Sequence, residues 1–158
     1  MSDLVRLIDT YLEGPKLLRA AVRGMTREQL LARPVAGKMS TLEVVCHLAD
    51  FEPILADRVK RVLTHDRPAL LGAKDDLFTA GLAYHERDLE EELALVEVTR
   101  SQLARILRTK TPEILTRVGV HSERGELTLE RILTMSCNHI PHHLPFIAEK
   151  KKALGVAG

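Results

Sequence analysis

The sequence predicts an all-α fold, a four-helix bundle that spans residues 1–158 as a single domain. Three observations support this prediction. Apolar residues recur at helical spacing in four long stretches, strand-like alternation is nearly absent, and the loops between the stretches are modest in length. With 158 residues, of which 45% are apolar and 28% charged, the chain can bury one core and has the composition of a globular protein.

The first two helices are expected near the N-terminus. Apolar residues at helical spacing predict a helix over about Asp3–Arg23, and Pro15 is expected to bend or divide it because proline lacks a backbone N–H. Thr26, followed three residues later by Gln29, has the pattern of a capping box. It predicts a short helix that stops before Pro34.

The second long helix is expected to begin after Ser40. This residue is a favourable N-cap, and Glu43 stands three residues on, where its carboxylate can accept a hydrogen bond from the backbone N–H of the cap. Apolar positions continue the helix to about Leu63, and Pro53 is expected to kink it. Residues 66–75 are expected to form a loop.

The second half of the chain is expected to hold two further helices. A long amphipathic pattern predicts one helix over about Asp76–Arg108. Residues 119–125 are expected to form a polar loop, after which Thr128 is a suitable N-cap for the last helix. Pro141 and Pro145 fall inside that last helix and predict a local distortion.

Charge and composition argue against several classes of function. The formal net charge is +1, so the chain has no strong field that would recruit nucleic acid or an anionic membrane. No apolar run approaches the roughly 20 residues of a membrane helix, and the first residues lack the layout of a signal peptide. Two cysteines do not form the disulfide framework of a secreted protein. We therefore expect a cytoplasmic protein that acts on a small molecule and binds neither nucleic acid nor membrane.

Three histidines form a candidate metal site. His139 and His143 are four residues apart on the predicted last helix, so both side chains project from one face. His47 lies near the start of the second long helix among apolar residues, which predicts that it points inward. Three imidazoles would hold one ion and leave positions open for water or substrate. Buried histidines with ordinary hydrogen-bond partners are the alternative, because this spacing also recurs by chance.

Other polar residues near the three histidines are expected to play lesser roles. His142 is turned about 100° around the helix from His143, which predicts a place at the rim of the site. His121, in its polar loop, is a candidate to fold over the site. Cys46 and Cys137 neighbour the histidines in sequence, but their angular positions favour small buried hydrophobic residues over zinc ligands.

The chain resembles the DinB/YfiT-like superfamily of metal-binding four-helix bundles over about Leu4–Ile147. The motifs that carry the resemblance are GKMSTLEVVCHLAD at residues 37–50, GVH at 119–121 continuing through GELTL at 125–129, and NHIPHHL at 138–144. Two departures stand out, since Met39 replaces a common tryptophan and residues 144–146 replace a common Arg-Gly-Gln.

The resemblance implies an up-down-down-up bundle and a metal ion held by His47, His139 and His143. It also implies a homodimer, and for some members a low-molecular-weight thiol cofactor. The metal is expected to be zinc or nickel, with iron and manganese as further options. Glu43 and Asp50 are candidates to orient an imidazole, although the capping box and a solvated helix position already explain them.

The leading expectation is a divalent-metal-dependent enzyme, either a thiol-dependent S-transferase or a hydrolase, because an ion with open positions lowers the pKa of bound water or thiol. The competing expectation is a non-catalytic metal-binding stress-response bundle. In that case the coordination shell would be closed by Cys46, Cys137 or His142, and the energy of metal binding would be folding energy. A di-iron centre is excluded because neither His139 nor His143 has a glutamate three residues before it.

Overall fold

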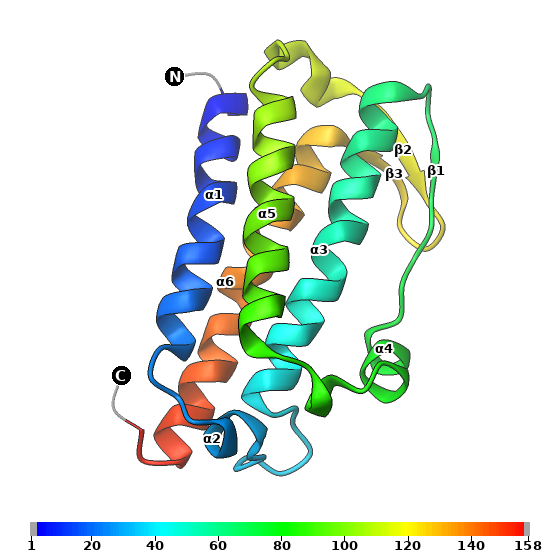
Figure 1. Cartoon of the computed structure of the whole chain (residues 1–158). Coiled ribbons are helices and arrows are strands. Elements are labelled where there is room, and N and C mark those ends of the chain that lie inside the picture. The colour runs from blue at the N-terminus through cyan, green and yellow to red at the C-terminus, as the bar shows by residue number, and fades with distance from the viewer. Residues whose placement is uncertain (1–2, 157–158) are drawn as a thin grey trace.

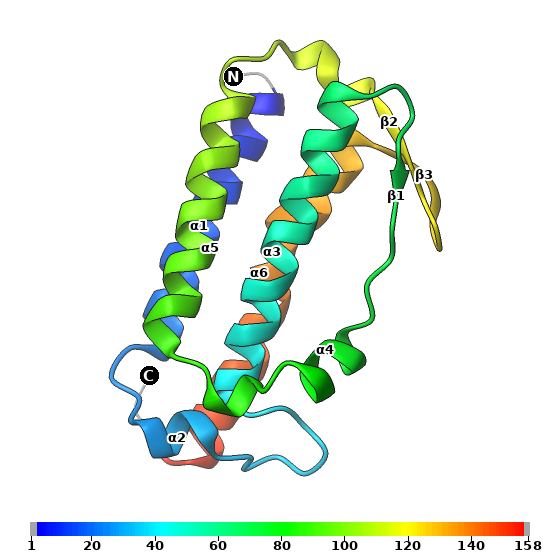
Figure 2. The same ribbon diagram turned by 45° about the vertical axis from the view of Figure 1, so that its right-hand side comes forward.

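The computed structural model describes residues 3–156, and its frame is a bundle of four long helices (Figure 1). They are α1 (Asp3–Val22), α3 (Thr41–Thr64), α5 (Leu89–Leu107) and α6 (Leu129–Ala153). Helices α1 and α6 run in one direction and α3 and α5 in the other, as Figures 1 and 2 show. Helix α1 packs against α5 and α6, and α3 packs against the same two helices. This is the up-down-down-up arrangement that the resemblance implies.

Three of the predicted helix starts are confirmed by their caps. Thr26 and Gln29 form a capping box at the short helix α2 (Arg27–Leu31), and Ser40 and Glu43 form another at α3. The hydroxyl of Thr128 accepts a hydrogen bond from a backbone N–H in the first turn of α6. Each cap satisfies N–H groups that have no partner inside the helix, so these boundaries are encoded locally.

Pro15 does not divide α1, which is continuous from Asp3 to Val22. The missing N–H of Pro15 leaves the carbonyl of Tyr11 without its usual helical donor. A side chain from another helix takes its place, because Nη1 of Arg100 donates to the Tyr11 carbonyl over 2.7 Å. A tertiary contact thus repairs the hydrogen bond that the proline removes. Helices α3 and α6 also run unbroken past their internal prolines.

The single helix predicted over about Asp76–Arg108 is wrong. The segment contains α4 (Asp75–Gly81), a 3-10 turn labelled η1 (Tyr84–Glu86) and then α5. Ala83 adopts a left-handed conformation with φ +48°, which an α-helix cannot contain. Asp88 then caps α5, since its carboxylate accepts from two backbone N–H groups of the first turn.

The polar loop predicted over 119–125 is also wrong, because residues 119–121 and 125 belong to the strands of a small sheet and only residues 122–124 form the turn between them. Strands β2 (Val118–His121) and β3 (Gly125–Thr128) form an antiparallel hairpin, and β1 (Ala69–Leu70) pairs with β2 in parallel. The hairpin lies close over α3, because a Cβ on Gly119 would stand 2.6 Å from the side chain of Leu70 and 2.8 Å from that of Val62. The sheet therefore covers one side of α3. A further 3-10 turn, η2 (Pro112–Thr116), precedes β2.

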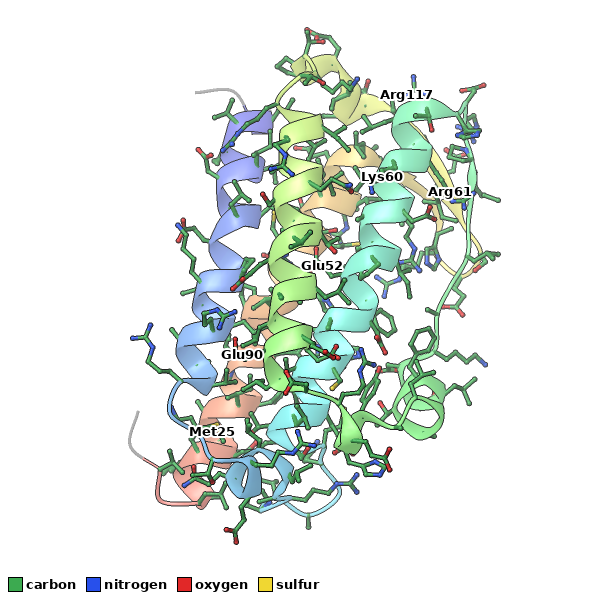
Figure 3. The ribbon with its side chains drawn as sticks, viewed as in Figure 1. Met25, Glu52, Lys60, Arg61, Glu90 and Arg117 are labelled. Atoms are coloured by element: carbon green, nitrogen blue, oxygen red, sulfur yellow. The ribbon has the colours of Figure 1, made fainter. Side chains whose placement is uncertain are left out.

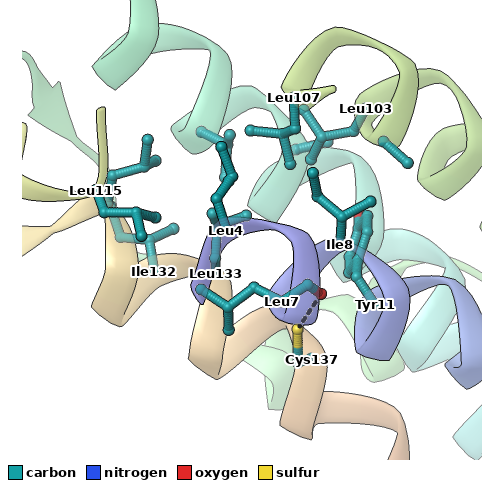
Figure 4. Close-up of a cluster of buried hydrophobic side chains, with 14 of the residues drawn as sticks. Leu4, Leu7, Ile8, Tyr11, Leu103, Leu107, Leu115, Ile132, Leu133 and Cys137 are labelled. Atoms are coloured by element: carbon teal, nitrogen blue, oxygen red, sulfur yellow. Dashed lines mark hydrogen bonds between the residues drawn. The ribbon is translucent and has the colours of Figure 1, made fainter. Parts of the chain in front are cut away.

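Two buried apolar clusters fill the bundle. Figure 4 shows the first, at the end of the bundle where α1 begins; it includes Leu4, Leu7, Ile8, Leu103 and Leu133. The second gathers residues of the opposite end, among them Leu18, Leu42, Leu48, Val96 and Ile147. No helix within residues 3–156 is both long enough and apolar enough to cross a membrane.

A buried ion pair lies between the two clusters. Arg100 of α5 and Glu52 of α3, whose side chains are both 0% exposed, are joined over 2.9 Å (Figure 3 labels Glu52). The hydroxyl of Tyr11 donates to the second oxygen of Glu52 over 2.5 Å, and Nη2 of Arg100 also donates to the carbonyl of Ser136 in α6. Arg100 therefore contacts all three other long helices.

Candidate metal site

The structure brings His47, His139 and His143 together between α3 and α6. One ligand-capable atom from each residue lies within 4.8 Å of the others. The Nε2 atoms of His47 and His139 are 3.1 Å apart. Among residues 3–156, these three form the one group of histidine, cysteine or carboxylate side chains close enough to share an ion.

Local structure explains why the three rings meet. His139 and His143 are one turn apart on the same face of α6, and that face packs against α3. His47 lies in the second turn of α3, at a position fixed by the capping box at Ser40. Its ring centroid is 5.1 Å from that of His139 and 4.7 Å from that of His143.

The donor set fits a divalent transition metal. Two nitrogen ligands of one zinc ion, each about 2.0–2.1 Å from it, stand roughly 3.0–3.4 Å apart, and the 3.1 Å between the His47 and His139 nitrogens matches this spacing. The Nδ1 atom of each of the three rings is buried and has no hydrogen-bond partner within residues 3–156. A neutral ring whose Nδ1 carries the proton keeps the lone pair of its Nε2 for a cation.

The electrostatic environment keeps the three rings neutral. Burial, reinforced by the neighbouring histidines, lowers the pKa of His139 to about 3. Burial is also the main reason why the pKa of His143 falls to about 4 and why that of His47 is lowered. A histidine must be deprotonated to bind a metal, so at neutral pH these rings are already in the binding form.

A cleft of about 360 Å³ opens beside the three rings. Its apolar wall is made by Phe51, Leu55 and Met135. Its polar groups are Arg58, Asp75, His121, Glu123, Arg124 and His142. A small molecule in this cleft would reach the ring nitrogens and ionisable groups of both signs. A larger groove of about 880 Å³ runs along α3 and residues 69–78, but it contains none of the three histidines.

The structure places His121 and His142 on the walls of this cleft. His121 is buried in β2, and its Nδ1 accepts a hydrogen bond from the backbone N–H of Glu123 over 3.1 Å. His142 contacts His143 edge to face, with ring centroids 5.1 Å apart, and also contacts Phe146. Neither belongs to the three-histidine group, so both line the site without completing it.

The two cysteines are buried and point elsewhere. The thiol of Cys46 donates to the carbonyl of Tyr84, and that of Cys137 donates to the carbonyl of Leu7 (Figure 4). Burial raises the pKa of Cys46 to about 12 and that of Cys137 to about 11, so both stay protonated. They are the small buried residues that the sequence favours.

Glu43 and Asp50 are engaged away from the imidazoles. Glu43 caps α3 and pairs with Arg33, while Asp50 pairs with Arg87 over 2.8 Å. Arg87 also bonds Glu92 and so links α3 to α5. These carboxylates stabilise the bundle, and the hydrogen bonds that they form do not include His47.

The sequence analysis did not identify the four charged residues of the cleft, which are Arg58, Asp75, Glu123 and Arg124. Arg58 lies eleven residues after His47 on α3, which is within about 20° of the same helical face, so its position was available from spacing. Asp75 begins α4 and Arg124 lies in the hairpin turn. Nothing local in the sequence marks these last two, because tertiary folding alone brings the two segments beside α6.

Comparison with known proteins decides the family. A family model described as the DinB superfamily matches residues 10–147. The chain belongs to the DinB superfamily. A Bacillus subtilis relative named "Putative metal-dependent hydrolase YfiT" is 30% identical over 144 residues, which make up 90% of this chain and 81% of the relative. An Oceanobacillus iheyensis relative, also named as a "Putative metal-dependent hydrolase", is 27% identical over 133 residues, 84% of this chain and 77% of the relative.

A solved structure agrees with this membership of the DinB superfamily. The structure of YfiT from Bacillus subtilis matches with a TM-score of 0.91 at 28% identity, and the match covers 99% of this chain and 91% of that chain. That structure is described as having an unusual four-helix bundle topology. The all-α class, the bundle and the family resemblance predicted from sequence are therefore confirmed.

Proposed function

We propose that this DinB-superfamily protein is a metal-dependent hydrolase of a small molecule, with one divalent transition metal ion held by His47, His139 and His143. The observation that carries the proposal is the convergence of three neutral imidazoles from two helices at the wall of an open cleft. The names of the relatives support the same class of reaction. Imidazole ligands suit zinc and nickel, and the protonated thiols of Cys46 and Cys137 fit a reducing cytoplasm.

The open cleft favours an enzyme over a closed structural site. A structural zinc site has four protein ligands, whereas a catalytic site has three and an open position. Cys46, Cys137 and His142 were the candidates for a fourth ligand. Both thiols point to backbone carbonyls, and His142 lies outside the three-histidine group. Within residues 3–156 no fourth side chain joins the group, so a bound ion would keep positions open for water or substrate.

A divalent ion held by the three histidines supplies Lewis acidity, which polarises a carbonyl group and lowers the pKa of water. Asp75 is the group placed to handle protons. It lines the cleft, and its negative charge acts on both His47 and His143. The Asp75 carboxylate accepts the proton that the attacking water loses and returns it to the leaving group. Phe51 and Leu55 form an apolar wall that limits the access of other water molecules.

Metal content and turnover test this proposal. Elemental analysis is expected to find about one ion per chain in the wild type and its loss in His47→Ala and His143→Ala. His85→Ala is the matched control, since His85 is exposed and outside the cleft. Metal retained in both ligand variants would contradict the assignment of the site.

Hydrolysis is measured with a panel of aryl esters and the metal-loaded protein. Asp75→Asn is expected to reduce kcat by about 10²–10⁴-fold with unchanged metal content, because it removes the proton acceptor and keeps the shape of the side chain. An unchanged kcat would remove Asp75 from the mechanism. Turnover that requires an added low-molecular-weight thiol and an electrophile would assign thiol transfer in place of hydrolysis.

A further inference from the structure

Two arginines from different elements line the cleft beside the three histidines. Arg58 projects from α3, and Arg124 lies in the turn between β2 and β3. Neither forms an ion pair with another residue in the range 3–156, in contrast to Arg87 and Arg100, whose guanidinium groups are paired with carboxylates. Arg58 is half-buried, and its Nε is buried without a hydrogen-bond partner in that range. Its Nη2 donates a hydrogen bond to the carbonyl of Leu71 over 2.6 Å.

The positive charges of this side of the cleft act on one another. Burial lowers the pKa of Arg58, and the charge of Arg124 is the next cause, ahead of the opposing effects of Asp57 and Glu123. Burial followed by the charges of Arg58 and Arg124 likewise lowers the pKa of His121. The two guanidinium groups and the His121 ring are thus close neighbours in the wall of the cleft, and within residues 3–156 neither guanidinium has an ion-pair partner.

The acidic groups of the cleft do not change this conclusion. Asp75 acts on His47 and His143, so it belongs to the three-histidine side. Glu123 lies against the backbone of Gly72, where a Cβ would be 2.9 Å from its carboxylate. The two ends of the cleft therefore differ in charge. The carboxylate of Asp75 lies beside the three histidines, and the guanidinium groups of Arg58 and Arg124 lie farther along α3.

We propose that Arg58 and Arg124 bind an oxyanion group of the substrate, a carboxylate or a phosphate, and so fix the reacting bond beside the three histidines. Guanidinium groups present planar pairs of N–H donors that match both kinds of anion. Position 58 lies three turns along α3 from His47, and both side chains line the same cleft, so one small molecule can reach both. The anion site itself needs no metal. The statement about the reacting bond rests on the proposed function.

Anion binding by the metal-free protein tests the proposal. The probes are inorganic phosphate and acetate, titrated separately at low ionic strength into ¹⁵N-labelled protein and followed by amide chemical shifts. We expect saturable shifts in residues 122–125, and a Kd that rises about tenfold or more in Arg124→Gln, which removes an exposed side chain. Arg58→Lys keeps the charge and removes the planar donors, so it is expected to weaken binding as well.

Arg105→Gln is the control, because Arg105 is exposed on α5 outside the cleft and the variant loses the same charge. Unchanged affinity in Arg58→Lys and Arg124→Gln, equal weakening in Arg105→Gln, or no saturable binding to the wild type would each overturn the proposal. A preference for phosphate or for acetate identifies the class of substrate anion. His47→Ala is expected to bind the anion as the wild type does, so a failure of the metal site would not be mistaken for a failure of the anion site.

Discussion

Replacing Arg100 with methionine tests the role of the buried ion pair at the centre of the bundle. Removal of one partner from a buried pair costs about 3–5 kcal/mol, because the other charge stays buried without compensation. Here the uncompensated group is Glu52, which is 0% exposed. The carbonyl of Tyr11 also loses its donor, since Pro15 supplies none. We therefore expect Arg100→Met to lower the free energy of unfolding by about 3–5 kcal/mol and Tm by roughly 6–20 °C.

Urea denaturation followed by far-UV circular dichroism measures this loss. Arg105→Met is the control on the same helix, and because this residue is exposed its effect is expected to stay within about 0.5 kcal/mol. A loss below about 1 kcal/mol in Arg100→Met would refute the reasoning. The double variant Arg100→Met/Glu52→Leu removes the unpaired charge and is expected to recover part of the stability, whereas no recovery would show that packing matters more than charge.

Three further predictions concern local structure. Gly14→Ala is expected to destabilise the protein by about 1–3 kcal/mol in urea denaturation, because the added Cβ overlaps the guanidinium of Arg100. Asp88→Ala removes the N-cap of α5 and is expected to cost about 0.5–2 kcal/mol by the same measurement. Burial would raise the pKa of Glu43, but hydrogen bonds from Ser40 and Arg33 outweigh it and lower the pKa below 4.5. The stability advantage of the wild type over Glu43→Gln is thus expected to be full above pH 4.5 and to disappear as the pH falls through the lowered pKa, which a pH series of thermal melts would show.

The starts of α2, α3 and α6 and the pairing of His139 with His143 were predictable because they depend on local spacing. A capping residue such as Ser40 satisfies N–H groups within its own first turn, so its effect can be read without knowing the tertiary structure. The rings of His139 and His143 share a face through the pitch of a single helix. That His47 joins these two rings follows from its apolar surroundings, which predict an inward-pointing side chain, and from the packing of α3 against α6.

The region between α3 and α5 was mispredicted because periodicity alone does not locate helix ends. Leu77 and Leu82 continue a helical apolar pattern, yet they are 63% and 45% exposed, and the left-handed Ala83 separates them from α5. Asp88, followed by three glutamates, was the available signal for a new helix. The short strands β2 and β3 have four residues each and depend on pairing and on packing over α3, which no local pattern reports.

The contacts of Arg100 also bear on how the candidate metal site is held. Arg100 bonds the carbonyl of Ser136, one turn before His139, and Glu52, which follows His47 by five residues on α3. Contacts between protein groups thus hold α3 and α6 together close to the three histidines. Because these contacts do not involve an ion, the apoprotein is expected to keep its bundle. An ion that binds is then expected to take the coordination geometry that the three histidine rings fix.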